Sequence, residues 1–123
     1  MKYYLSLCSV IKDEDYLEEY ILYYKLNGVE HFYLYDNESK YPLKKRLNHP
    51  IFKKMCTIID YPGKCRQFDA YNDCINKTKN VSKWLIIVDG DEFIFTRDDI
   101  SLRRFLNYYE DDNCHALGIN WLM

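Results

Sequence analysis

The sequence has few residues that break up secondary structure, and it lacks two common phosphate-binding motifs. It contains four glycines and three prolines in 123 residues, which leaves little material for linkers or low-complexity tracts. No G-x-G-x-x-G follows the first apolar run and no G-x-x-x-x-G-K-[ST] occurs anywhere, so a dinucleotide fingerprint and a P-loop are both absent. A chain of this length and composition predicts a single domain, residues 1–123, with a core of its own.

Other features that the sequence lacks argue against several kinds of partner and cellular location. The formal net charge of −2 and the scattered lysines give no field for nucleic acid, so no nucleic-acid partner is expected. No apolar run approaches membrane-spanning length and no signal peptide opens the chain, which predicts no transmembrane segment and a cytoplasmic location. The five cysteines are odd in number and form no C-x-x-C pair, which favours reduced thiols over a disulfide framework or a zinc site.

Apolar runs and helical patterns alternate along most of the chain. Runs typical of strands occupy residues 3–10, 31–35, 55–60 and 84–88, with weaker candidates at 93–95 and 114–123. Helical periodicity follows the first strand from Asp13 to Gly28, recurs around residues 68–75 and 102–109, and is short and basic at 42–47. This order predicts an α/β domain with a mostly parallel sheet flanked by helices.

The most informative stretch is the run 84–88 followed by Asp89, Gly90, Asp91 and Glu92. It is typical of a buried strand whose carboxyl end presents acids, and Gly90 is expected to let the backbone turn sharply between the two aspartates. Two carboxylates about 5 Å apart repel by roughly 3 kcal/mol at an effective dielectric near 20. Mn²⁺ or Mg²⁺, which take oxygen ligands, would relieve that repulsion. A solvated acidic turn after a core strand is the alternative.

Other polar residues are expected at the same edge of the sheet. Right-handed crossovers place all strand-to-helix loops together, and ligands of such sheets bind beyond the carboxyl ends of the strands. The segments that would meet there are residues 11–14, 35–37, 60–63 and 89–91, with Arg66 and Gln67 just after the third. They suit a ribose and phosphate ligand held through a metal. Alternatively, Asp36 is only a turn residue, and Lys12, Glu14, Arg66 and Gln67 are charges and polar groups at helix starts. The tyrosines of the first helix are interpreted mainly as packing residues.

Several blocks resemble one enzyme family. Residues 11–14, 27–32, 35–37, 71–74 and 84–93 follow the order and spacing of the glycosyltransferase family 92 and family 2-like group, the amino-terminal donor-binding part of D-x-D nucleotide-sugar transferases with the GT-A fold. The resemblance covers nearly the whole chain. It departs from the family at Lys12-Asp13-Glu14, where K-N-E is usual, which puts the contacts of that loop in doubt.

The resemblance implies roles for individual residues. Asp91 would bind Mn²⁺ or Mg²⁺ that bridges two phosphates, and Asp89 would face the ribose, the metal or a metal-bound water. Asp36 would lie beside the base or ribose. The remaining candidates divide between a base-packing loop and the diphosphate side: Lys12 and Glu14 in the first group, Arg66 and Gln67 in the second.

The resulting functional hypothesis is a metal-dependent glycosyltransferase that takes a sugar from a nucleotide-diphosphate sugar, with UDP as the default nucleotide. The acceptor (glycan, protein or lipid) and the catalytic residues are unknown, because the family takes its base from a later segment. The chain alone is therefore expected to bind a donor and transfer little. A non-catalytic nucleotide-sugar-binding module and a D-x-D aspartyl phosphotransferase or phosphatase are the alternatives. The apolar stretch 114–123 predicts a sheet edge and self-association through it.

Overall fold

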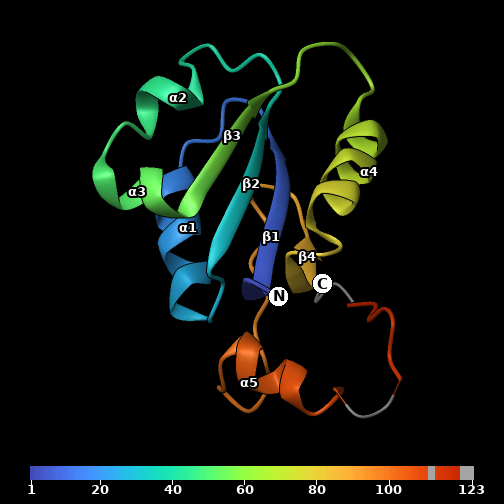
Figure 1. Cartoon of the computed structure of the whole chain (residues 1–123). Coiled ribbons are helices and arrows are strands. Elements are labelled where there is room, and N and C mark those ends of the chain that lie inside the picture. Colours follow the sequence, from blue (N-terminus) through green and yellow to red (C-terminus); the bar gives the residue numbers. More distant parts are fainter. Residues whose placement is uncertain (111–112, 120–123) are drawn as a thin grey trace.

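The computed structural model describes residues 1–110 and 113–119, and it is an α/β domain built on a parallel sheet (Figure 1). The four strands are all parallel and lie in the order β3-β2-β1-β4. Their bounds are β1 Tyr3–Ile11, β2 His31–Asp36, β3 Cys56–Asp60 and β4 Ser82–Ile87. The predicted fold class is confirmed, and the first strand lies inside the sheet as its apolar sequence indicates.

Helices cover both faces of the sheet because side chains alternate along each strand. Their bounds are α1 Leu17–Leu26, α2 Leu43–Arg46, α3 Pro50–Met55, α4 Gln67–Thr78 and α5 Leu102–Asn107. Leu5 and Leu7 of β1 pack with α1 in the larger hydrophobic cluster. Cys8 belongs to a second cluster with Ala70 and Cys74 of α4. The period of two in β1 therefore separates two cores, one on each side of the sheet.

Helix α1 forms where the periodicity predicts it, but its start differs. Leu17, Tyr20, Ile21 and Tyr24 are all fully buried, as expected for one apolar face. Gly28 lies just past the helix with φ 98°, the left-handed conformation that ends helices and favours glycine. The helix starts later than the periodicity from Asp13 predicts, because its first residue is Leu17. The Asp13 carboxylate instead accepts a hydrogen bond from the backbone N–H of Lys40 at 2.7 Å.

Three other expectations about elements need correction. Strand β4 is an edge strand of the described sheet and is only partly buried, since its outer side meets no further strand in the described part of the chain. Residues 93–95 form no strand, because side chains of α1 rather than a neighbouring strand bond their backbone. Residues 114–119 contain no strand either, which removes the basis for self-association there, and positions 120–123 lie outside the described residues.

Helix α3 is absent from the sequence-based prediction. Pro50 occupies its first position, where a missing N–H costs nothing, and the His49 side chain accepts from the Ile51 N–H at 3.2 Å. Of the helices in residues 1–110 and 113–119, none combines the length and apolarity needed to cross a bilayer.

Candidate functional site

The loops that follow the strands leave the sheet at one edge. The last residues of three strands lie side by side, with Ile11 opposite Asp36 and Asp36 opposite Asp60. Strand β4 ends slightly earlier, where the Val88 N–H donates to the Cys8 carbonyl at 3.3 Å. The residues that follow β4 therefore lie beside the loop between β1 and α1.

Residues 88–94, here named the acid turn, carry the D-x-D sequence. The turn is closed by two hydrogen bonds between Asp89 and Glu92: the Asp89 N–H donates to Glu92 Oε1 at 2.9 Å, and the Glu92 N–H donates to the Asp89 carbonyl at 3.1 Å. Gln67, in the first turn of α4, donates to Asp89 Oδ1 at 3.0 Å and to the Tyr71 hydroxyl at 2.7 Å. Gln67 thus orients one of the two aspartates, and it does not extend freely into solvent.

Gly90 packs closely against the loop between β1 and α1. A Cβ atom at this position would lie 2.6 Å from Ile11 Cδ1 and 3.0 Å from Glu14 Cγ. Its φ is not in the left-handed region, unlike those of Gly28 and Gly63. The backbone does turn at Gly90 as predicted, but the turn needs no left-handed φ, and glycine suits this position because a Cβ would crowd Ile11 and Glu14.

Glu14 joins the acids of the turn. Burial raises the pKa of Glu14, and the nearby charges of Asp91, Asp15 and Asp89 raise it further, while Arg46 opposes the shift. The pKa of Asp89 is raised by partial desolvation and by the charges of Glu92 and Asp91, while hydrogen bonds from Tyr71 and Gln67 oppose the shift. The structure therefore gathers carboxylates that are distant in sequence at a single point, where their charges repel.

The donor set fits a hard divalent cation only with help from a ligand. Across residues 1–110 and 113–119, no three Cys, His, Asp or Glu side chains come close enough to hold a metal by themselves. Mg²⁺ is commonly bound by one or two carboxylates together with water and substrate phosphates, and Mn²⁺ shares its preference for oxygen ligands. Asp89 and Asp91 are both exposed and can supply such a partial set.

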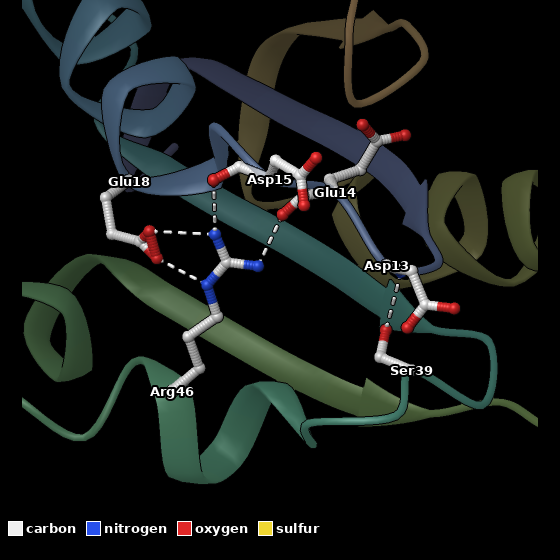
Figure 2. Close-up of polar contacts among 6 residues, drawn as sticks. All are labelled: Asp13, Glu14, Asp15, Glu18, Ser39 and Arg46. Carbon is white, nitrogen blue, oxygen red and sulfur yellow. Dashed lines mark hydrogen bonds and ion pairs between the residues drawn. The ribbon is translucent and has the colours of Figure 1, made fainter.

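Arg46 of α2 holds the loop between β1 and α1 in place (Figure 2). Its guanidinium donates to the main-chain carbonyls of Glu14 and Asp15 and pairs with the carboxylate of Glu18. This pairing lowers the pKa of Glu18. Figure 2 shows the Glu14 carboxylate pointing away from the guanidinium. Arg46 thus fixes the backbone of Glu14 and leaves its side chain free to approach the acid turn. The sequence of this short basic helix does not predict that Arg46 would fix the loop between β1 and α1.

Asp36 is buried and already has partners. Its Oδ1 accepts from the Ser39 N–H at 3.1 Å, and its Oδ2 accepts from the Leu43 N–H at 3.0 Å. The side chain therefore organises the turn after β2 and the start of α2. Its contact with a nucleoside remains an untested prediction.

We expect Asp36→Ala to destabilise the domain by about 1–3 kcal/mol, because buried N–H groups, such as that of Leu43, lose their acceptor. Asp60→Ala is the matched control. Asp60 ends the neighbouring strand, but the ion pair that it makes with Lys44 is exposed, and such pairs contribute little. Urea unfolding of both variants measures the difference. Equal stability losses would show that the Asp36 contacts are not important.

The other predicted residues lie near the edge with different partners. The Arg66 guanidinium stacks 3.8 Å above the centre of the Tyr61 ring and donates to the Pro62 carbonyl at 3.0 Å. Lys12 is exposed. Asn37, which the sequence flagged only as part of a motif, donates to the carbonyls of Tyr61 at 2.9 Å and Gly63 at 2.8 Å. Asn37 thereby ties the loop after β2 to the loop after β3.

A separate groove of about 660 Å³ lies at the opposite end of the sheet, between the end of α1, helix α3 and Arg103. It includes Lys25, Ile51 and Met55 and none of the carboxylates described above. The acid turn lies away from this groove, and its two aspartates are exposed.

Comparisons with known proteins point to one family. A family model described as glycosyltransferase family 92 matches residues 2–121. A glycosyltransferase family 92 protein of Ricinus communis is 25% identical over 95% of this chain, which corresponds to 23% of the relative. One of Oryza sativa subsp. japonica is 23% identical over 93% of this chain and 21% of the relative. The chain thus spans about a fifth to a quarter of the length of these relatives. No solved structure matches.

Proposed function

The chain belongs to glycosyltransferase family 92, and from this premise we propose that it is the donor-binding part of a GT-A-type glycosyltransferase that uses a nucleotide-diphosphate sugar, with UDP as the default nucleotide. One observation carries the proposal: the D-x-D sequence lies at the carboxyl edge of a parallel sheet, beside Glu14 from the neighbouring loop. Ligands of parallel α/β sheets bind at this edge. The α/β architecture supports the assignment to this fold class.

In this proposal Asp91 and Asp89 would hold Mn²⁺ or Mg²⁺ together with the two phosphates of the donor. The bound cation would offset the negative charge on the departing nucleoside diphosphate. Gln67 keeps the Asp89 carboxylate oriented through its 3.0 Å hydrogen bond. Glu14 adds negative charge close to Asp91, which favours a cation at this point.

Two positively charged side chains near this edge of the sheet are available to contact the rest of the donor. Lys12 is exposed in the loop after β1, and Arg66 stands at the start of α4 beside Tyr61. We assign them to the nucleotide and the diphosphate respectively. Asp36 stays assigned to the base or ribose, since each of its oxygens accepts one backbone N–H and can accept a further hydrogen bond.

A non-catalytic nucleotide-sugar-binding module is the second candidate. It is favoured by the candidate residues themselves, since each of them is assigned to the donor or to its metal. Transfer also needs an acceptor site and, for an inverting reaction, a carboxylate base within hydrogen-bond reach of the acceptor hydroxyl. We assign no residue of this chain to that role.

The proposal is tested by calorimetry of the chain with UDP-sugars, GDP-sugars and CMP-sugars, each with and without Mn²⁺. We expect binding of a UDP-sugar that depends on Mn²⁺, and little transfer when UDP release is followed in parallel. Absence of any Mn²⁺-dependent nucleotide binding would contradict the proposed function. Robust turnover by the chain alone would instead reveal a catalytic base within these 123 residues.

A further inference from the structure

Two tyrosines of α1 bond the far side of the acid turn. The Tyr24 hydroxyl donates to the Glu92 carbonyl at 2.6 Å and accepts from the Ile94 N–H at 2.9 Å. The Tyr23 hydroxyl donates to the Ile94 carbonyl at 2.6 Å. Three backbone groups that follow the D-x-D sequence are therefore fixed by side chains of a helix about 70 residues earlier in the chain.

The near side of the turn is fixed by a different hydroxyl. Ser9 Oγ donates to the Val88 carbonyl at 2.6 Å, and it lies 2.6 Å from the Tyr20 hydroxyl in a second hydrogen bond. Ser9 and Tyr20 are fully buried. The acid turn is therefore anchored at both ends, to β1 at Val88 and to α1 at Glu92 and Ile94.

The turn needs these anchors because it has no regular secondary structure and carries repelling charges. Residues 88–94 belong to no helix or strand, so their polar backbone groups must find partners elsewhere. Repulsion from Glu92 and Asp91 contributes to the raised pKa of Asp89, and the same force would drive an unanchored turn open.

Hydroxyl groups are suited to this task because they carry no charge. Burial raises the pKa of Tyr24 to about 12, so its hydroxyl keeps its proton at neutral pH. A lysine or arginine in its place would pair with the carboxylates and compete with a metal for them. The neutral anchors fix the backbone and leave the charge of the acids available.

We propose that Ser9, Tyr23 and Tyr24 are positioning residues that hold the acid turn in one conformation, so that Asp89 and Asp91 meet their metal and diphosphate from a fixed backbone. This inference rests on the proposed function. It adds a hydrogen-bonding role to the packing role that the sequence predicts for the tyrosines of α1. Their rings do pack: the Phe93 ring centre lies 5.1 Å from that of Tyr23 and 5.6 Å from that of Tyr20.

The test is Tyr24→Phe, which removes the hydroxyl and keeps the ring. Tyr35→Phe is the matched control: Tyr35 is also fully buried, and its hydroxyl donates to Asp73 Oδ2 at 2.6 Å, away from the acid turn. Mn²⁺ affinity is measured by electron paramagnetic resonance in the presence of UDP, and stability by urea unfolding. We expect Tyr24→Phe to weaken Mn²⁺ binding about tenfold, within the range for removing groups that orient metal ligands. Tyr35→Phe should leave the affinity unchanged despite a similar loss of stability.

Ser9→Ala gives a second, independent variant at the other end of the turn, and it should also weaken Mn²⁺ binding. Hydrogen exchange adds a readout that needs no ligand, since the Ile94 amide should exchange faster in Tyr24→Phe than in the wild type. Wild-type affinity in both Tyr24→Phe and Ser9→Ala would overturn the positioning role while leaving the proposed function intact. Failure of the wild type to bind Mn²⁺ with UDP would instead reject the proposed function itself.

Discussion

Asp91→Asn is expected to reduce Mn²⁺-dependent binding of a UDP-sugar by at least about 100-fold, since loss of residues that merely support a metal ligand already costs 10–100-fold. The amide keeps the size of the side chain and removes its charge. Asp91 is exposed and follows Gly90 in the acid turn, so its loss should leave the core untouched. Calorimetry with and without Mn²⁺ measures the effect.

The same substitution should not destabilise the protein. Asp91 contributes to the raised pKa values of Glu14 and Asp89. An acid whose pKa is raised by folding favours the folded state only while it is protonated, and that contribution is lost as the pH rises through the raised pKa. At neutral pH the variant is therefore expected to melt at or above the wild-type temperature, and the difference should shrink as the pH falls toward the ordinary carboxyl range.

Asp98→Asn is a control that removes one exposed acid outside the acid turn. It should leave Mn²⁺-dependent binding unchanged. Retention of wild-type affinity by Asp91→Asn would contradict the assignment of Asp91 as the metal ligand through which Mn²⁺ and the nucleotide bind together. A variant that loses both affinity and its cooperative melting transition would indicate that Asp91 supports the fold.

Gly90→Ala is expected to lower both stability and metal affinity. The new methyl group would lie 2.6 Å from Ile11 Cδ1, and Ile11 is fully buried in the main core. Inserting a methyl group into a packed site typically costs about 1–3 kcal/mol. Because Ile11 is enclosed in the core, we expect the turn, and not the Ile11 side chain, to move, and this movement would separate Asp91 from Glu14. We expect a roughly tenfold loss of Mn²⁺ affinity together with the lower stability, comparable to the loss of a supporting residue.

Gly118→Ala is the matched control, because a Cβ at Gly118 meets no other described atom within 4 Å. It should change neither property. Urea unfolding and Mn²⁺ titration of both variants show whether the losses come from steric crowding at position 90 or from replacing any glycine by alanine. Full stability and full affinity in Gly90→Ala would show that the acid turn moves without cost.

The sequence by itself determined most of the helices and strands and the place of the acids. The buried face of α1, its end before Gly28 and the parallel α/β class follow from local periodicity, which the backbone imposes within a few residues. The position of Asp89 and Asp91 after a strand follows from the apolar run that precedes them. The start of α1 was mistaken, because the Asp13 side chain bonds the distant Lys40 N–H instead of its own helix.

Only the tertiary structure decided which residues surround those acids. Strand β4 pairs with β1 rather than with β3, and this places the acid turn beside Glu14. The bonds of Arg46 to the β1–α1 loop and α1, and those of the Ser9, Tyr23 and Tyr24 hydroxyls to the acid turn, join residues 28 or more positions apart in the chain. Such contacts leave no local pattern, because the same arginine or tyrosine also suits an exposed or packed helical position. Their partners are set by strand order and by the burial of whole faces, which no short stretch of sequence encodes.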